Sequence, residues 1–192
     1  MAEIIKEKPA VRERREKSDN FAANSAEQKQ FQEIVINVDR VSRVVKGGRR
    51  FRFKALVVVG DGKNKVGVGV AKGADVQAAV NKATNVAKKS LVTISIKNTT
   101  IAHEVEAREG GAHVLLMPAA PGTGIIAGGV VRNVISVTGI HNLLSKSLGS
   151  TNKVNIAYAT VEALKQVVPE KNWVTRSSET KASPKTAAKE KK

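Results

Sequence analysis

Apolar and polar residues alternate along the first structured part of the chain, a pattern typical of strands in a sheet that is covered on one face. Ile34, Ile36 and Val38 form the first apolar stripe, and the alternation slips after Asp39, which indicates a β-bulge there. Glycine, asparagine and aspartate separate the apolar runs and predict turns between them. Three successive strands are expected, over residues 31–45, 50–59 and 65–71.

A period of 3.6 residues then replaces the period of two. Four apolar residues fall on one face of a helix that Asp75 caps and that ends near residue 90. Lysine, asparagine and glutamine occupy the outward positions, as expected for a helix that packs on a sheet. The predicted first unit is therefore β-β-β-α. The apolar helix positions are Val76, Val80, Ala83 and Ala87.

Shorter apolar runs follow and predict a second unit of mixed helix and strand, so the fold class is α+β. A glycine-rich stretch leads into a helix that ends near residue 137. Asn152 caps a last helix, which Pro169 ends. Strands are expected near 92–96, 100–106, 113–118 and 141–148. The predicted buried stripe of the last helix consists of Val154, Ala157, Val161, Leu164 and Val168.

The two ends of the chain lack the large apolar residues that a folded unit needs. Residues 1–28 mix charges of both signs and are predicted to form a disordered N-terminal arm. Residues 169–192 are predicted to form a basic, largely disordered tail, in which Trp173 is a candidate anchor. The folded part divides into two predicted domains, 29–96 and 97–168.

The net charge of the chain indicates what kind of partner it binds. The 192 residues include 33 Lys and Arg against 17 Asp and Glu, a formal net charge of +16. This balance favours a polyanionic partner, namely RNA, DNA or an anionic membrane, over a merely solvated basic surface. The chain has no cysteine, which excludes disulfides and Cys-ligated metal sites and fits a reducing cytoplasm. No cofactor, signal peptide or membrane span is predicted.

The positive charge is concentrated around the turn between the first two strands. Residues 40–54 contain seven cations and no acid. Strand alternation places three of these cations on one face at a spacing of ~6.6–6.8 Å, which resembles the spacing of phosphates along a nucleic-acid strand. Phe51, Phe53 and Ala55 occupy the other face and are expected to be buried against the helix, so base stacking is a weak hypothesis. The three cations are Arg50, Arg52 and Lys54.

Gly47 and Gly48 lie at the tip of this predicted hairpin, between Lys46 and Arg49. Because glycine has no Cβ atom, the backbone there can approach a partner closely and adopt positive φ. The amides can then meet phosphate oxygens or the wall of a groove. The alternative interpretation is a plain hairpin tip on a solvated basic strand.

Two long segments of the chain resemble a known family. They are VDRVSRVVKGGRRFRFKALVVVGDGKNKVGVGVAKG, at residues 38–73, and MPAAPGTGIIAGGVVRNVISVTGIHNLLSKSLGSTN, at residues 117–152. With the sequence around them, over residues 31–168, they resemble the bacterial small-subunit ribosomal protein S5 family. The resemblance implies an N-terminal fold like the double-stranded-RNA-binding domain. It also implies a second α+β domain with a βαβ crossover of left-handed sense.

The same resemblance implies a structural, non-enzymatic constituent of the small ribosomal subunit in the cytoplasm. Such a protein binds ribosomal RNA, supports subunit assembly, contacts ribosomal proteins S4 and S8, and lies near the messenger RNA entry path. The loop that matches residues 45–50 would reach the RNA of the subunit neck, beside the spectinomycin site. The segment that matches residues 122–132 would lie at the S4 contact, where changes alter decoding accuracy.

Candidate site residues follow from the basic hairpin and from the resemblance together. The candidate RNA-binding residues are Arg40, Ser42, Arg43, Lys46, Gly47, Gly48, Arg49, Arg50, Arg52, Lys54, Lys63, Lys65, Lys72 and Asn152. The candidate partner-protein interface consists of Gly122, Thr123, Gly124, Ile125, Ile126, Gly128, Gly129 and Arg132.

Two other classes of protein remain as alternatives. The stretches GTGIIAGG and GVGVAKGAD suggest an enzyme with a nucleotide-binding loop, but neither has the G-x-G-x-x-G or G-K-[ST] pattern. A membrane-surface protein would need a helix face richer in Leu, Phe or Trp than the predicted Val and Ala face. His103, His113 and His141 stand singly in the sequence, so no metal site is predicted.

Overall fold

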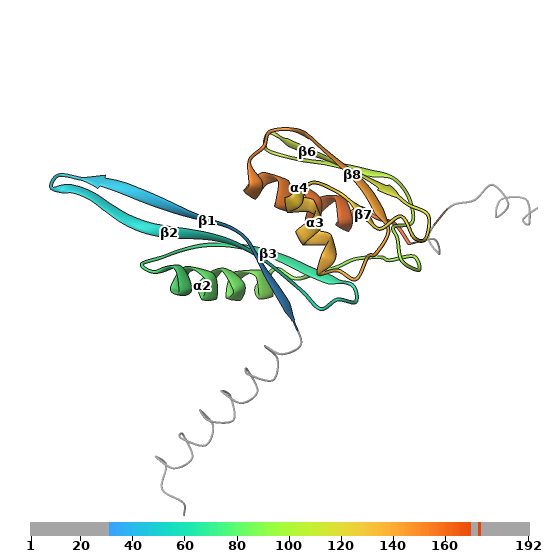
Figure 1. The fold of residues 1–192 in the computed structure, drawn as a ribbon, viewed down its shortest axis with the longest axis horizontal. Coiled ribbons are helices and arrows are strands. Elements are labelled where there is room, and N and C mark those ends of the chain that lie inside the picture. The colour runs from blue at the N-terminus through green and yellow to red at the C-terminus, as the bar shows by residue number, and fades with distance from the viewer. Residues whose placement is uncertain (1–30, 170–172, 174–192) are drawn as a thin grey trace, which may run out of the picture.

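The computed structural model describes residues 31–169 and residue 173. The predicted arm at 1–28 and nearly all of the predicted tail at 169–192 therefore lie outside the described residues. Figure 1 shows two packed units and a long hairpin that projects from the first of them.

The first unit has the predicted β-β-β-α order. An antiparallel sheet with the strand order β1-β2-β3-β4 carries helix α2 on one face. A fourth strand of two residues pairs with the start of β3, where a longer strand over 92–96 was expected. The elements are β1 (Gln32–Val45), β2 (Gly48–Gly60), β3 (Lys65–Gly73), α2 (Val76–Lys89) and β4 (Val92–Thr93).

Helix α2 lies close to the sheet because β3 carries glycines beneath it. A Cβ atom on Gly67 or Gly69 would collide with the α2 backbone, so only glycine permits this approach. The buried face of α2 differs from the prediction, since Ala79 and Thr84 are buried and Val76 is exposed. Asp75 occupies the N-cap position, but its side chain makes no capping hydrogen bond.

The β-bulge in β1 lies earlier than predicted. The pairing with β2 shifts between Val35 and Asn37, not after Asp39. Ile34 and Ile36 both pack against the main core, whereas Val38 is turned to the other face and is 39% exposed. Counting Val38 in the apolar stripe is what misplaced the bulge in the sequence.

The second unit is a four-stranded sheet with two helices on one face. Its strand order is β5-β6-β8-β7, and β7 runs parallel to its neighbour β8, with α3 as the connection between them. This confirms a βαβ crossover; its left-handed sense stays a prediction. The elements are β5 (Val105–Glu109), β6 (Ala112–Pro118), β7 (Ile125–Ile126), α3 (Gly129–Ser136), β8 (Leu143–Gly149) and α4 (Lys153–Lys165).

Two predicted boundaries in the second unit are wrong. The strand expected over 100–106 begins only at Val105, because Lys97 and Thr100 instead pair with each other in a tight loop. Helix α4 ends at Lys165, so the helical period stops there. As a result Val167 is buried and Val168, placed by the prediction in the buried stripe, is exposed.

One hydrophobic core joins the two units. Leu56 and Val58 point from β2 away from α2, and they belong to the same cluster as Ile135 of α3 and Leu116 of β6. Helices α3 and α4 lie between the two sheets (Figure 1). The first sheet is therefore covered on both faces near β3, by α2 on one side and by the second unit on the other.

Candidate nucleic-acid interface

The distal half of the β1–β2 hairpin extends beyond the rest of the protein as a two-stranded ribbon (Figure 1). Strand β3 pairs with β2 only from Phe53 onward, so residues 48–52 pair with β1 alone. Helix α2, with 14 residues, is about 21 Å long, whereas β2, with 13 residues, is about 43 Å long. The helix therefore covers about half of the strand.

One face of this ribbon brings together four cations. Arg43 pairs directly with Arg50 across the two strands, and Arg52 follows on the same face. With Lys72 of β3 these arginines surround a hollow of about 200 Å³, whose wall also includes Val41 and Ser42. We call Arg43, Arg50, Arg52 and Lys72 the cationic cluster.

Among the described residues the cationic cluster lacks an acidic partner. Within residues 31–169, no ion pair involves any of its four side chains, and all four are exposed. Like charges directly opposite each other in a sheet, such as Arg43 and Arg50, are destabilising. A bound polyanion would relieve this repulsion, because phosphate oxygens would supply the missing counter-charge.

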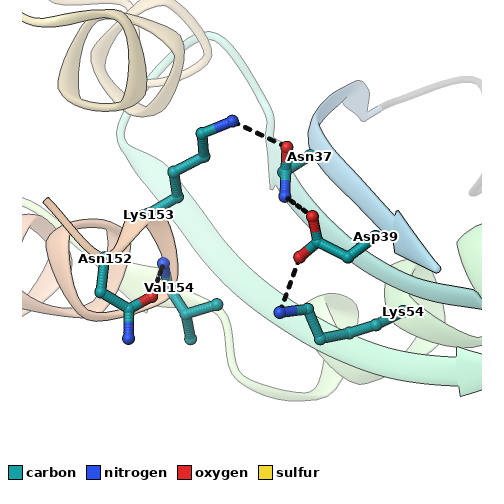
Figure 2. Close-up of polar contacts among 6 residues, drawn as sticks. All are labelled: Asn37, Asp39, Lys54, Asn152, Lys153 and Val154. Carbon is teal, nitrogen blue, oxygen red and sulfur yellow. Dashed lines mark hydrogen bonds and ion pairs between the residues drawn. The ribbon is translucent and has the colours of Figure 1, made fainter. Parts of the chain in front are cut away.

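Lys54 differs from the cations nearer the tip. Its Nζ atom lies 2.8 Å from Asp39 Oδ2, and Asn37 Nδ2 donates to Asp39 Oδ1 at 2.6 Å (Figure 2). Hydrogen bonds from Lys54 and then from Asn37 lower the pKa of Asp39. Lys153 at the start of α4 donates to Asn37 Oδ1 at 2.8 Å, which extends the polar chain to the second unit. The charge of Lys54 is thus largely balanced within the protein.

The prediction that Phe51 is buried against the helix is wrong. Its side chain is 49% exposed, and the guanidinium carbon of Arg40 lies 3.8 Å from the centre of its ring. Phe53 is half-buried against the apolar residues between the sheet and α2, and Ala55 is fully buried. Alternation gave the correct face for all three residues, but the N-terminal end of α2, which lies beside Gly73 and its partner Phe53, does not extend as far as Phe51.

The tip of the hairpin is a two-residue turn. Val45 pairs with Gly48, which leaves Lys46 and Gly47 as the loop. Gly48 has a φ of 134°, a conformation that favours glycine. No atom lies within 4 Å of a Cβ built on Gly47 or Gly48, so both face open space, and Arg49 beside them is exposed.

The structure separates three predicted RNA-binding residues from the cationic cluster. Lys63 and Lys65 lie at the turn between β2 and β3, at the opposite end of β2 from the hairpin tip. Asn152 caps α4, since its Oδ1 accepts from Val154 N at 3.2 Å, as the sequence predicted (Figure 2).

The predicted partner-protein residues lie along a separate edge of the molecule. Gly122 to Ile126 form a loop and the edge strand β7, and Gly128 to Arg132 begin α3. Ile126 is 54% exposed and Arg132 is exposed, so an apolar and a charged side chain are both accessible there.

The sequence interpretation missed Asn142, the residue that holds this loop in place. Its buried Oδ1 accepts from the backbone amides of Gly122 and Gly124, at 3.1 and 3.0 Å. Its Nδ2 donates to Thr99 Oγ1 at 2.8 Å. A single asparagine in an apolar run is the one available sequence signal, because a buried amide requires partners.

The histidines of the described residues do not gather with acidic side chains as metal ligands would. His113 contacts Glu106 at 3.0 Å, and His103 accepts from Val168 N at 3.0 Å, so these two histidines are engaged in separate local contacts. Over residues 31–169 no three His, Asp or Glu side chains come together as metal ligands, and none of the helices there is long and apolar enough to cross a membrane.

Comparison with known proteins agrees with this two-unit architecture. Residues 31–95 match the family model described as ribosomal protein S5, N-terminal domain, and residues 107–173 match ribosomal protein S5, C-terminal domain. A curated relative, small ribosomal subunit protein uS5 of Idiomarina loihiensis (strain ATCC BAA-735 / DSM 15497 / L2-TR), is 52% identical over 132 residues, which cover 69% of this chain and 80% of the relative. The chain belongs to the ribosomal protein S5 family.

Members of the S5 family are structural components of the ribosome and not enzymes. The interpretation of the two glycine-rich stretches as nucleotide loops is therefore set aside. Gly67 and Gly69, in one stretch, permit the close packing of α2, and Gly122 and Gly124, in the other, donate to Asn142.

Proposed function

We propose that this S5 family member is a structural constituent of the small ribosomal subunit and binds its ribosomal RNA through the β1–β2 hairpin. The observation that carries the proposal is the cationic cluster, in which Arg43, Arg50 and Arg52 share one exposed face with Lys72. Arginine is well suited to phosphate, because its planar guanidinium donates two parallel hydrogen bonds.

The shape of the hairpin supports recognition of folded RNA. A narrow ribbon that projects from a rigid body can enter a junction that the body itself cannot reach. Two features of the hairpin favour contact with RNA in one orientation. The base of the hairpin is held by the chain of contacts from Lys54 through Asp39 and Asn37 to Lys153. Its tip presents Gly47 and Gly48 without side chains, so the backbone can lie against a phosphate or a groove wall.

The edge formed by β7 and the start of α3 is the proposed contact with a neighbouring ribosomal protein. It offers the exposed Ile126 beside Arg132, a combination of apolar and charged groups that is common at protein interfaces. By the family resemblance the neighbour at this edge is S4, and S8 is a further partner of the protein. The same resemblance supports roles in subunit assembly, in decoding accuracy and along the messenger RNA entry path.

Sedimentation of a cell lysate through a sucrose gradient tests the placement in the small subunit. The protein should sediment with the small-subunit peak and remain there at moderate salt, because many phosphate and protein contacts act together. Recovery only at the top of the gradient, at low as well as moderate salt, would contradict the proposal. The cationic cluster would then serve another polyanion.

A further inference from the structure

The second face of the hairpin, opposite the cationic cluster, carries a different chemistry. We propose that Arg40 and Phe51 form a stacking site for an unpaired nucleobase of RNA. The proposal rests on the proposed function, because it takes RNA as the partner. It adds a contact to bases where the cationic cluster accounts only for contacts to phosphates.

The register of the hairpin defines the two faces. Arg43 pairs with Arg50, and Val41 with Arg52, on the face of the cationic cluster. Ser42 pairs with Phe51, and Arg40 with Phe53, so Arg40 and Phe51 are diagonal neighbours on the other face.

Arg40 and Phe51 present two flat surfaces already held in place. The guanidinium carbon lies 3.8 Å from the ring centre, within the range of a cation–π contact. Even with Arg40 above it, the Phe51 side chain remains 49% exposed. Phenylalanine rings and guanidinium planes are the groups on which proteins stack unpaired bases, and a side chain already ordered loses little entropy on binding.

The surroundings of the pair fit a nucleotide better than a protein. Arg49 lies on the same face, since it pairs with Val44, and it can meet the phosphate of a stacked nucleotide. The ribbon contains no acid from residue 40 to residue 54, so nothing on it repels an RNA backbone. The neighbouring Val44 is 74% exposed and extends the apolar floor beside the ring. The hairpin would thus lie between two parts of an RNA, with phosphates on one face and a splayed base on the other.

The test compares full-length variants in their binding to small-subunit ribosomal RNA over a range of salt concentrations. Phe51→Leu keeps an apolar side chain but removes the ring, and Phe51→Tyr keeps the ring. Arg40→Lys keeps the charge but removes the flat guanidinium. Phe51→Leu and Arg40→Lys should each weaken binding, the former about tenfold. The salt slope should be unchanged, because no phosphate contact is lost. Phe51→Tyr should bind like the parent protein.

A second measurement locates the contact directly. Ultraviolet irradiation of the bound complex, followed by mass spectrometry, should give a nucleotide adduct on the peptide that contains Phe51. Unchanged affinity in Phe51→Leu would overturn the stacking site, as would an equal loss in Phe51→Leu and Phe51→Tyr. Normal RNA affinity with poor recovery of Phe51→Leu in small-subunit particles would assign this face to a protein and also overturn it. Failure of the parent protein to bind the RNA at all would instead contradict the proposed function.

Discussion

Lys54 Nζ lies 2.8 Å from Asp39 Oδ2 at the point where the hairpin leaves the body of the protein. This pair divides the cations of the hairpin into two kinds. The charge of Lys54 is balanced by the Asp39 carboxylate, which Asn37 links to Lys153 of α4. Lys54 therefore helps to hold the hairpin in position. The arginines nearer the tip have no such partner within residues 31–169 and keep their charge for a ligand.

The balance between Lys54 and Asp39 predicts that removing both charges has little effect on RNA affinity. The double variant Asp39→Asn/Lys54→Gln leaves the net charge unchanged and retains an acceptor for Asn37. Its affinity for small-subunit ribosomal RNA should stay within about twofold of the parent protein. Arg50→Gln/Arg52→Gln, measured alongside by filter binding, should lose at least tenfold, since each lost phosphate contact removes favourable counterion release. Equal losses in the two double variants would mean that Lys54 also reaches the RNA.

The two glycines of the tip should respond differently to substitution. Gly47 faces open space and has no left-handed φ, so Gly47→Val should leave the melting temperature of the free protein nearly unchanged while impairing RNA binding. Gly48 has a φ of 134°, and Gly48→Ala should destabilise the protein by about 1 kcal/mol. Thermal unfolding of both variants checks this. A large drop in melting temperature for Gly47→Val would make that glycine structural.

Asn142 should hold the glycine-rich loop around Gly122 and Gly124 in its conformation. Asn142→Ala removes the acceptor of two backbone amides, Gly122 N and Gly124 N, and should cost about 1–3 kcal/mol in the free energy of unfolding. Thr99→Val is the matched control, because it removes only the contact to Nδ2. Hydrogen exchange should show faster exchange at Gly122 and Gly124 in Asn142→Ala alone. Protection as strong as in the parent protein would contradict this role.

The turn after β2 should make the protein sensitive to acid. Burial disfavours the charged form of Asp61, but its Oδ1 accepts from the amides of Lys65, Lys63 and Asn64, at 2.9 to 3.0 Å, and these bonds lower its pKa below the ordinary 3.8. A carboxyl with a lowered pKa stabilises the fold above its unfolded pKa, and this contribution is lost as the pH falls through the folded pKa. Unfolding free energies measured between pH 6 and pH 2.5 should therefore fall below about pH 4.

The variant Asp61→Asn isolates this contribution. Asparagine keeps an acceptor for the turn but does not titrate, so the loss of stability below about pH 4 should be smaller than in the parent protein. Identical acid profiles for the two proteins would show that the carboxylate of Asp61 does not contribute.

The sequence predicted the class of the fold and the shared face of Arg50 and Arg52 because both depend on local pattern. Alternation alone assigns Arg50 and Arg52 to one face and Phe51 to the other. Alternation does not predict how far along a strand the packed helix extends. The exposure of Phe51 depends on this extent, because α2 is shorter than β2. The bulge before Asn37 and the end of α4 at Lys165 also differ from the positions that the periodic pattern predicted.

The sequence also could not predict the hydrogen-bond partners of single polar residues. Asn142 and Thr99 lie 43 positions apart, and Lys153 and Asn37 lie 116 apart. Contacts at such separations depend on the tertiary arrangement and leave no periodic trace. The N-cap role of Asn152 could be predicted, in contrast, because its partner Val154 is two residues away.

The salt dependence of RNA binding shows directly whether the cationic cluster contacts RNA phosphates. The triple variant Arg43→Gln/Arg50→Gln/Arg52→Gln should be compared with a control that loses three exposed lysines elsewhere, Lys82→Gln/Lys89→Gln/Lys146→Gln. The hairpin variant should lower the slope of log affinity against log salt by about two to three units, while the control keeps the parent slope. A hairpin variant with the parent slope and affinity would contradict RNA binding by the cationic cluster, which would then be a solvated surface.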